Sequence, residues 1–427
     1  MSSVGLLQPI LDGGIRTTTF FNGRLLTGED LTAEQQAAQQ AHALLGSALG
    51  DGIVWGLQVG GSVTSTPRSP SITVFAGLAV NRLGQVLALN APATGVEVTL
   101  VRPTPPGTPA GITRAGFVDR LPPQAGVYVA GTLAYLLVIA PASGSEGLAP
   151  TSGLNGIAPT CATRYTVEGV QFRLVQMDVA SSVLNDQAHL RNLLAHLCFG
   201  TSDDRLQVLH RDPFGPNVDG SSYGAVDQLR ASGLVTDADV PLAVIHWTDA
   251  GAVEFVDMWS ARRRLVRRAT VPEWLTGAQD RRLAEGEAML AQFQAQLLDV
   301  RLGNTSPQSV AATDVYRFLP PVGLVPISAI GFAPAFDAQR FFGSTVTRGP
   351  AVLDAASMDA VVHMALHYAP IDLQNPAPVW LYRIRENWPL PGATPSPAPY
   401  LLFTTGHVPF MGRAGFDLGR WDYGAYE

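Results

Sequence analysis

One serine flanked by glycines could act as a nucleophile in this 427-residue chain. The stretch GSSYG, residues 220–224, matches the G-x-S-x-G pattern, in which the serine lies on a sharp turn between a buried strand and a helix. A helix can follow over residues 225–230, but the polar stretch HRDPFGPNVD comes before the motif. Because the preceding buried strand is missing, the pattern favours an ordinary glycine- and serine-rich loop over a hydrolase that uses Ser222.

Two histidine pairs have a spacing that could place both rings on one face of a helix. His363 and His367 are four residues apart, and His189 and His196 are seven apart. Two histidines at the shorter spacing can hold zinc, but the glutamate of the metalloprotease motif is absent between them and no third ligand is evident nearby. We therefore expect ordinary helix histidines and no bound metal.

The acidic residues do not form a recognisable catalytic pattern. Glu168, Asp257, Asp314 and Asp354 are scattered along the chain, and nothing in their spacing indicates that two of them converge as an acid–base pair. Phosphate-loop, dinucleotide-binding and EF-hand patterns are also absent. The expectation is a protein without catalytic residues or a cofactor, and hence not an enzyme.

A single basic run, RRRLVRR, could bind an acidic partner. Its arginines are Arg262, Arg263, Arg264, Arg267 and Arg268. The formal net charge of −7 argues against a nucleic-acid binder, which normally presents a basic face. The run therefore favours an acidic protein partner slightly over the alternative, a solvated strand end.

The sequence pattern of helices and strands, which must position these residues, predicts an α+β protein that is mainly β with inserted helices. Short apolar strands with glycine- and proline-rich connections indicate a multi-domain, β-sandwich-like architecture. Helical periodicity predicts one N-terminal helix and one long helix near 275–302. We predict a docking segment, two β-rich domains, a region around the long helix and a proline-rich C-terminal domain, with boundaries at 1–59, 60–160, 161–271, 272–310 and 311–427.

The N-terminal helix has its own start, stop and apolar stripe. Thr27 stands three residues before Asp30, which is close to a capping box. Leu31, Ala38 and Leu45 are seven residues apart, with Glu34 and Ala41 between them. This spacing gives one narrow apolar stripe on a helix rich in alanine and glutamine. Three glycines end the helix: Gly46, Gly50 and Gly52.

The same region resembles a known family. FFNGRLLTGEDLTAEQQ, then His42, LGDGIVWGLQV and ITVFAGLAVNRLGQVLAL resemble a recurrent opening of phage tail proteins and of similar proteins in contractile injection systems. The stretches CATRYTVEGVQFRL and RFLPPVGLVPI also look like that group. Asn81 replaces the aspartate that is commoner there. The resemblance implies a structural role without catalysis and leaves open whether the chain belongs to the baseplate, a fibre or the cap.

We therefore expect an assembly interface within residues 20–59, although a helix packed on its own domain is the alternative. The expected interface residues are Phe20, Phe21, Leu31, Ala38, Ala41, Leu45 and Trp55. The partners would be other tail or baseplate subunits or further copies of the chain, with a trimer possible. Nucleic acid is not expected as a partner, because of the net negative charge. A membrane span is not expected either, since no run of about 18 apolar residues occurs. Without a signal-peptide pattern, we expect synthesis in the cytoplasm and later incorporation into a particle.

A second function remains open from the sequence: a receptor- or glycan-binding fibre module. Exposed aromatic rings would then stack on sugars, and the C-terminal part offers Trp380, Tyr382, Trp388 and Trp421. A hydrolase that uses Ser222 is the third possibility.

The serine motif leads to a direct test. We expect Ser222→Ala to leave any measured hydrolysis of ester, peptide or glycan substrates unchanged, because the motif lacks its preceding strand. Assays of purified wild-type and variant protein against a panel of these substrates measure this. An activity that the variant loses would replace the structural interpretation with an enzymatic one.

Overall fold

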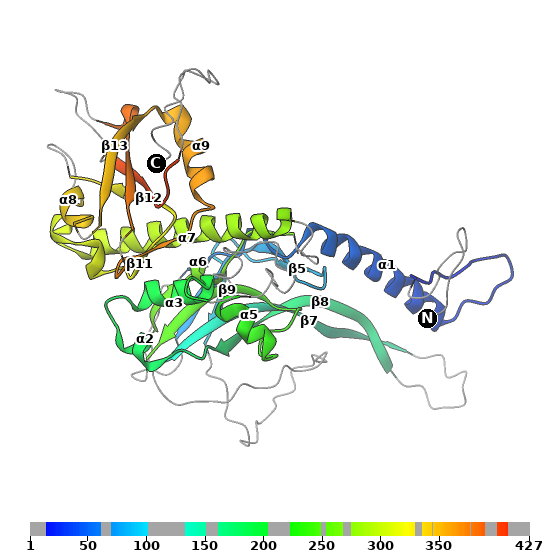
Figure 1. The fold of residues 1–427 in the computed structure, drawn as a ribbon. Helices are drawn as coiled ribbons and strands as arrows, with labels where there is room; N and C mark the ends of the chain where they lie inside the picture. The colour runs from blue at the N-terminus through cyan, green and yellow to red at the C-terminus, as the bar shows by residue number, and fades with distance from the viewer. Residues whose placement is uncertain are drawn as a thin grey trace, which may run out of the picture.

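A computed structural model shows the arrangement of the chain (Figure 1). It describes residues 14–60, 70–100, 133–150, 161–203, 223–248, 253–267, 275–328, 335–343, 345–375, 377–388 and 399–408. Helix and strand occupy about equal shares, so the predicted α+β class is confirmed.

The first part of the chain forms a helix and two small antiparallel sheets. Helix α1 spans Gly28–Leu49. One sheet has the order β1-β4-β5, with bounds Gly52–Gly56, Gly77–Val80 and Val86–Leu89. The other has the order β2-β3-β6, with bounds Val59–Gly60, Ser71–Val74 and Val96–Thr99.

A four-stranded antiparallel sheet forms the centre of this half. Its order is β10-β9-β7-β8, with bounds Val253–Asp257, Val240–Trp247, Leu133–Pro150 and Cys161–Gln176. Alternate residues of β7 point to opposite faces. Tyr135, Leu137 and Ile139 join the core shared with the two small sheets, which gives sheet-on-sheet packing. Ala134, Leu136 and Val138 join a second core on the other face.

Short helices cover that second face. They are α2 (Ser181–Asn185), α3 (Leu190–Phe199), α5 (Gly224–Ala231) and α6 (Met258–Ala261). Leu190 and Leu194 of α3 and Leu229 of α5 are buried against the sheet. Gly200 ends α3 in the left-handed conformation, with φ 69°, which glycine adopts without strain.

The long helix α7, Leu275–Gly303, lies between the two halves of the molecule (Figure 1). Ala288 and Met289 pack on Ala195 and Phe199 of α3. Other α7 side chains enter the two cores of the C-terminal half, Phe293 and Leu297 in one and Leu283 and Leu290 in the other. Since different sides of α7 face different cores, its apolar residues are not confined to one stripe.

The C-terminal half packs a mixed sheet against α7. Its order is β12-β16-β15-β13, with bounds Val322–Pro326, Tyr400–Thr404, Val379–Ile384 and Thr347–Leu353. Strand β13 runs parallel to β15, and the other pairs are antiparallel. A short pair, β11 (Phe318–Leu319) and β14 (Ile371–Asp372), and helices α8 (Ala338–Phe341) and α9 (Ala355–Ala365) complete this half. Single 3₁₀ turns occupy Pro307–Ser309, Ala312–Asp314 and Arg385–Asn387.

The structure bears on one of the predicted domain boundaries. Strands β7 and β8 stay paired from Tyr135↔Gln176 to Pro150↔Cys161, so β7 continues as far as Pro150. The boundary placed at 160/161 thus falls between two neighbouring strands of one sheet. Strand β1 exposes Val54 and Trp55, and Trp55 is one of the expected interface residues.

The buried side chain of Asn192 connects α3 of the N-terminal half with the backbone of the C-terminal half. Asn192 of α3 accepts hydrogen bonds through Oδ1 from the backbone N–H of Arg317, at 2.9 Å, and of Phe318, at 2.8 Å. Its Nδ2 donates to the carbonyl oxygen of Phe318 at 3.1 Å. The asparagine side chain therefore provides hydrogen-bond partners for the backbone where β11 begins, at Arg317 and Phe318.

Asn192→Ala should lower the free energy of unfolding by about 3 kcal/mol, because it leaves buried N–H groups without an acceptor. Chemical denaturation monitored by circular dichroism measures the change. Gln374→Ala, at an exposed position, serves as the matched control and should change stability by less than about 0.5 kcal/mol. Equal stabilities of the two variants would contradict the proposed role of Asn192.

Candidate functional site

Helix α1 and the loop before it form an arm, residues 14–49, that projects from the body (Figure 1). The predicted capping box is present: the hydroxyl of Thr27 accepts a hydrogen bond from Asp30 N, and the Asp30 carboxylate accepts from Thr27 N. These bonds to Thr27, with a smaller contribution from Arg24, lower the pKa of Asp30 below its usual value. The start of the helix is therefore set by local sequence.

The loop before α1 folds back along the helix. Thr18 N donates to Glu34 Oε2 at 2.9 Å, and its hydroxyl donates to the carbonyl oxygen of Asp30 at 3.3 Å. Arg24 forms an ion pair with Asp30 and a hydrogen bond with the carbonyl oxygen of Thr19. These contacts hold the FFNGRLL segment at the far end of the arm.

The arm carries a large exposed apolar surface. Six of the seven residues expected at an interface are exposed, and Ala41 is half-buried. Further exposed large side chains lie on the arm at Ile15, Leu25, Leu26, Leu44 and Leu49. Leu25 and Leu26 belong to the motif FFNGRLL and could have been predicted from it. Among the described residues outside the arm, the exposed large hydrophobic side chains are Val54, Trp55, Leu83, Val86, Leu148, Tyr165, Val167, Leu298, Leu302, Val346, Val352 and Met364.

The part of α1 after Glu34 also lacks charged residues. Residues 35–49, QQAAQQAHALLGSAL, contain no aspartate, glutamate, lysine or arginine. Within α1 only Ala37 and Gly46 are buried, so the helix packs little against its own chain. A solvent-facing helix normally has a charged face, and exposed apolar patches on soluble proteins mark interaction sites.

The base of the arm is held by close backbone contacts. Gly46 and Gly84 allow α1 to approach the β4–β5 turn, because a Cβ on Gly46 would lie 2.1 Å from the Gly84 carbonyl oxygen. Asn81 orders that turn by accepting hydrogen bonds from the backbone N–H of Leu83 and Gln85. Beyond the helix, Asp51 exchanges backbone hydrogen bonds with Val266.

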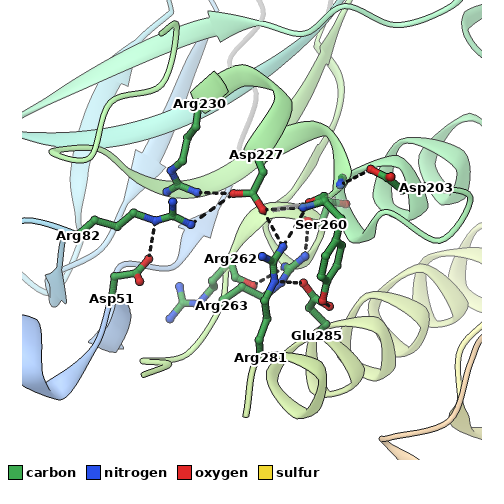
Figure 2. Close-up of polar contacts among 12 residues, drawn as sticks. Asp51, Arg82, Asp203, Asp227, Arg230, Ser260, Arg262, Arg263, Arg281 and Glu285 are labelled. Atoms are coloured by element: carbon green, nitrogen blue, oxygen red, sulfur yellow. Dashed lines mark hydrogen bonds and ion pairs between the residues drawn. The ribbon is translucent and has the colours of Figure 1, made fainter. Parts of the chain in front are cut away.

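A partly buried ionic network, which we call the polar joint, lies next to this base and consists of Asp51, Arg82, Tyr223, Asp227, Arg230, Arg281 and Glu285 (Figure 2). Asp227 of α5 contacts three arginines: Arg281 at 2.8 Å, Arg82 at 3.3 Å and Arg230 at 3.4 Å. Arg82 continues to Asp51 at 3.4 Å, directly after the arm. The joint thereby connects the arm base with α5 and α7.

Helix α7 contributes Arg281 and Glu285 to the joint. Arg281 pairs with Glu285 at 3.0 Å and lies 3.8 Å from the centre of the Tyr223 ring. Tyr223 donates its hydroxyl proton to Glu285. Burial, followed by the nearby charge of Glu285, raises the pKa of Tyr223 well above its usual value. The tyrosine therefore stays protonated as a donor.

The charged groups of the polar joint pair with one another and are not arranged for proton transfer. Burial opposes ionisation of Asp227, but the attraction of Arg281, Arg82 and Arg230 outweighs it and lowers the pKa of this carboxyl group. Each carboxylate of the joint has at least one arginine partner, and arginine does not release its proton in proteins. Such an arrangement offers neither a general base nor an activated nucleophile.

The basic run has an internal role instead of the expected exposed one. Arg262 is buried and donates to the carbonyl oxygens of Leu57 and Gly56. Arg263 lies 4.6 Å from the centre of the Phe199 ring and donates to the carbonyl oxygens of residues 259, 260 and 262. Arg264 pairs with Asp280 and Glu287 of α7. Arg267 is exposed, and Arg268 lies outside the described residues.

The members of the two histidine pairs lie in different surroundings. His196 is buried, and burial lowers its pKa to about 3. His189 contacts Asp186 and the carbonyl oxygen of Thr313. The rings of His363 and His367 lie 6.2 Å apart, and within the described residues no group of three metal-ligating side chains forms.

The four scattered carboxylates have separate structural roles. Asp257 caps α6 and pairs with Arg191, and Asp354 caps α9. Asp314 accepts from the N–H of Ala311, and Glu168 accepts from Gln39 of the arm. The buried thiol of Cys198 has its pKa raised to about 12, chiefly by burial, and is therefore a poor nucleophile at neutral pH.

The C-terminal aromatic residues do not form one open stacking surface. Tyr382 is buried, and its hydroxyl accepts from Val408 N. The guanidinium of Arg383 lies 3.6 Å from the centre of the Trp388 ring and covers it. Trp380 is half-buried against His407. Ser222 and Trp421 lie outside the described residues.

Comparisons with known proteins do not assign the chain to a family. No protein-family model matches the sequence, and no curated protein matches it significantly. Among the described residues, no helix is both long and apolar enough to span a membrane.

The polar joint predicts a measurable pH dependence. The folded-state pKa of Asp227 is depressed, so its contribution to stability is present above the unfolded-state value of about 3.9 and is lost as pH falls through the lower folded-state value. Asp227→Asn should lower the free energy of unfolding at pH 7 by about 3 kcal/mol and weaken the loss of stability below about pH 4. Denaturant unfolding between pH 2.5 and 7 measures both effects.

The control for this experiment is Asp359→Asn, at an exposed position of α9. It should reproduce the wild-type pH profile. The assignment of the acid dependence to the joint fails if Asp227→Asn and Asp359→Asn have the same stability and the same acid dependence.

Proposed function

We propose that the chain is a structural subunit of a phage-tail-like or contractile injection particle and that the arm docks it into the assembly. The observation that carries this proposal is the exposed apolar surface of the arm, together with the absence of charged residues over positions 35–49. Such a surface loses its contact with water when it is covered by a partner.

The energetics of the helix support a docking role. In proteins most of the stability of a helix comes from packing against another surface rather than from its intrinsic propensity. In α1 only Ala37 and Gly46 are buried by the chain itself. Burial of apolar area contributes roughly 25 cal/mol per Å², so covering several exposed leucines would stabilise an assembly substantially.

The base of the arm is fixed to the body, so a partner bound to the arm would also fix the orientation of the body. The Gly46–Gly84 contact, the Asp51–Val266 backbone pair and the polar joint bind the arm to the body at three separate places. Docking at the arm would therefore orient the body relative to its partner.

The N-terminal motif FFNGRLLTGEDL suggests the class of particle. Its resemblance to openings of phage-tail-like proteins supports other tail or baseplate subunits, and further copies of this chain, as partners. In this proposal the chain is not an enzyme; it is made in the cytoplasm and becomes part of the particle. A glycan-binding role receives less support, because Tyr382 is buried and Arg383 covers Trp388.

Ala38→Glu should leave the chain folded but abolish docking, because the exposed alanine becomes a carboxylate that loses its hydration at the interface. Circular dichroism checks folding, and light scattering and pull-down with the other particle components check assembly. We expect at least a tenfold loss of binding.

The matched control is Gln40→Glu, which places the same charge on an exposed position of the same helix. It should bind like the wild type. Normal assembly of Ala38→Glu would contradict the docking role of this face, and unfolding of Ala38→Glu alone would place Ala38 in the core of its own domain.

A further inference from the structure

We infer that the arm binds other copies of the same chain, with their α1 helices aligned in parallel along one stripe. The stripe consists of Leu31, Gln35, Ala38, His42, Leu45 and Leu49. This inference rests on the proposed docking function and names the partner of the arm.

The spacing of the stripe is that of a helix–helix seam. Successive members are four, three, four, three and four residues apart, which is the alternation of core positions in a coiled coil. All six are exposed, whereas Glu34 and Ala41, which the sequence suggested as stripe members, are half-buried. The available seam therefore passes through Gln35 and His42.

The order of apolar and polar residues favours a parallel arrangement. In a parallel bundle each layer contains the same residue from every copy, so Gln35 meets Gln35 and the leucines meet leucines. An antiparallel pair centred on the stripe would place Gln35 against Leu45 and His42 against Ala38. That arrangement leaves the buried polar groups without partners, which costs about 1–3 kcal/mol for each group.

The distribution of charge favours like copies over an oppositely charged partner. The whole chain has a formal net charge of −7, so copies repel one another unless their contact surface is neutral. Residues 35–49 provide that neutral surface. Glu34 lies beside the stripe, between Leu31 and Gln35. Its carboxylate accepts a hydrogen bond from Thr18 N of the same copy.

Small residues beside the stripe permit close contact between the helices. Ala38 lies in the middle of the seam, and Ala41 and Ala48 flank it. Gln35 and His42 can form hydrogen bonds with their equivalents across the bundle. Polar residues at single core positions are known to set the register of such bundles.

Disulfide cross-linking of the full-length protein tests the arrangement. Gln35→Cys, in a Cys161→Ser background, should form a disulfide between two copies under mild oxidation, because a parallel bundle places position 35 next to itself. Gln40→Cys, exposed on the opposite side of the helix, is the control and should yield at least tenfold less cross-linked dimer. Non-reducing gel electrophoresis and light scattering measure the product and the number of copies.

A second experiment identifies the direction of the helices. Gln35→Cys protein is mixed with tagged Leu45→Cys protein, and products that join the two variants are counted. The parallel arrangement predicts few of them, whereas an excess of mixed products would establish an antiparallel pair and overturn the inference.

The outcomes also separate this inference from the proposed function. If Gln35→Cys yields no more cross-linked dimer than Gln40→Cys while Ala38→Glu still abolishes pull-down of particle components, the arm docks onto a different subunit and the inference is wrong. If Ala38→Glu also assembles normally, the docking function itself is wrong.

Discussion

The burial of α7 on several sides is the constraint on which the rest of the structure depends. Ala288 and Met289 contact the N-terminal half, and Phe293 and Leu297 enter a core of the C-terminal half. Gly286 brings the helix close to the backbone at Leu366, where a Cβ would lie 2.2 Å from the carbonyl oxygen. Because α7 is shared in this way, the two halves cannot separate without exposing the apolar residues of the helix.

The polar groups of α7 extend this connection toward the arm. Arg281 and Glu285 belong to the polar joint, whose chain of ion pairs continues through Asp227 and Arg82 to Asp51 (Figure 2). Buried ion pairs add little net stability compared with apolar packing, but breaking one is costly. The joint therefore contributes mainly to a defined position of the arm base relative to α7, which a flexible apolar contact would specify less well.

Local signals in the sequence predict the elements better than their surroundings. Thr27 and Asp30 predict the start of α1, and the spacing of apolar residues predicts α7, because both depend on short-range geometry. The internal role of Arg262 could not be predicted, since its carbonyl partners at Leu57 and Gly56 are 205 and 206 residues away in the chain. The polar joint could not be predicted for the same reason: its members come from segments far apart in the sequence and share no motif.

The arm shows why sequence pattern and structure must be combined to find an interface. The pattern indicates a narrow apolar stripe, but a pattern alone does not distinguish a stripe that faces its own core from one that faces a partner. The structure makes this distinction, since Ala37 is buried while Leu31, Ala38 and Leu45 are exposed. Helix α1 is anchored at its base, is exposed along most of its length and has no charged residue between positions 35 and 49. Its exposed leucines are therefore not covered by the described part of its own chain, which is the observation that the proposed docking of the arm explains.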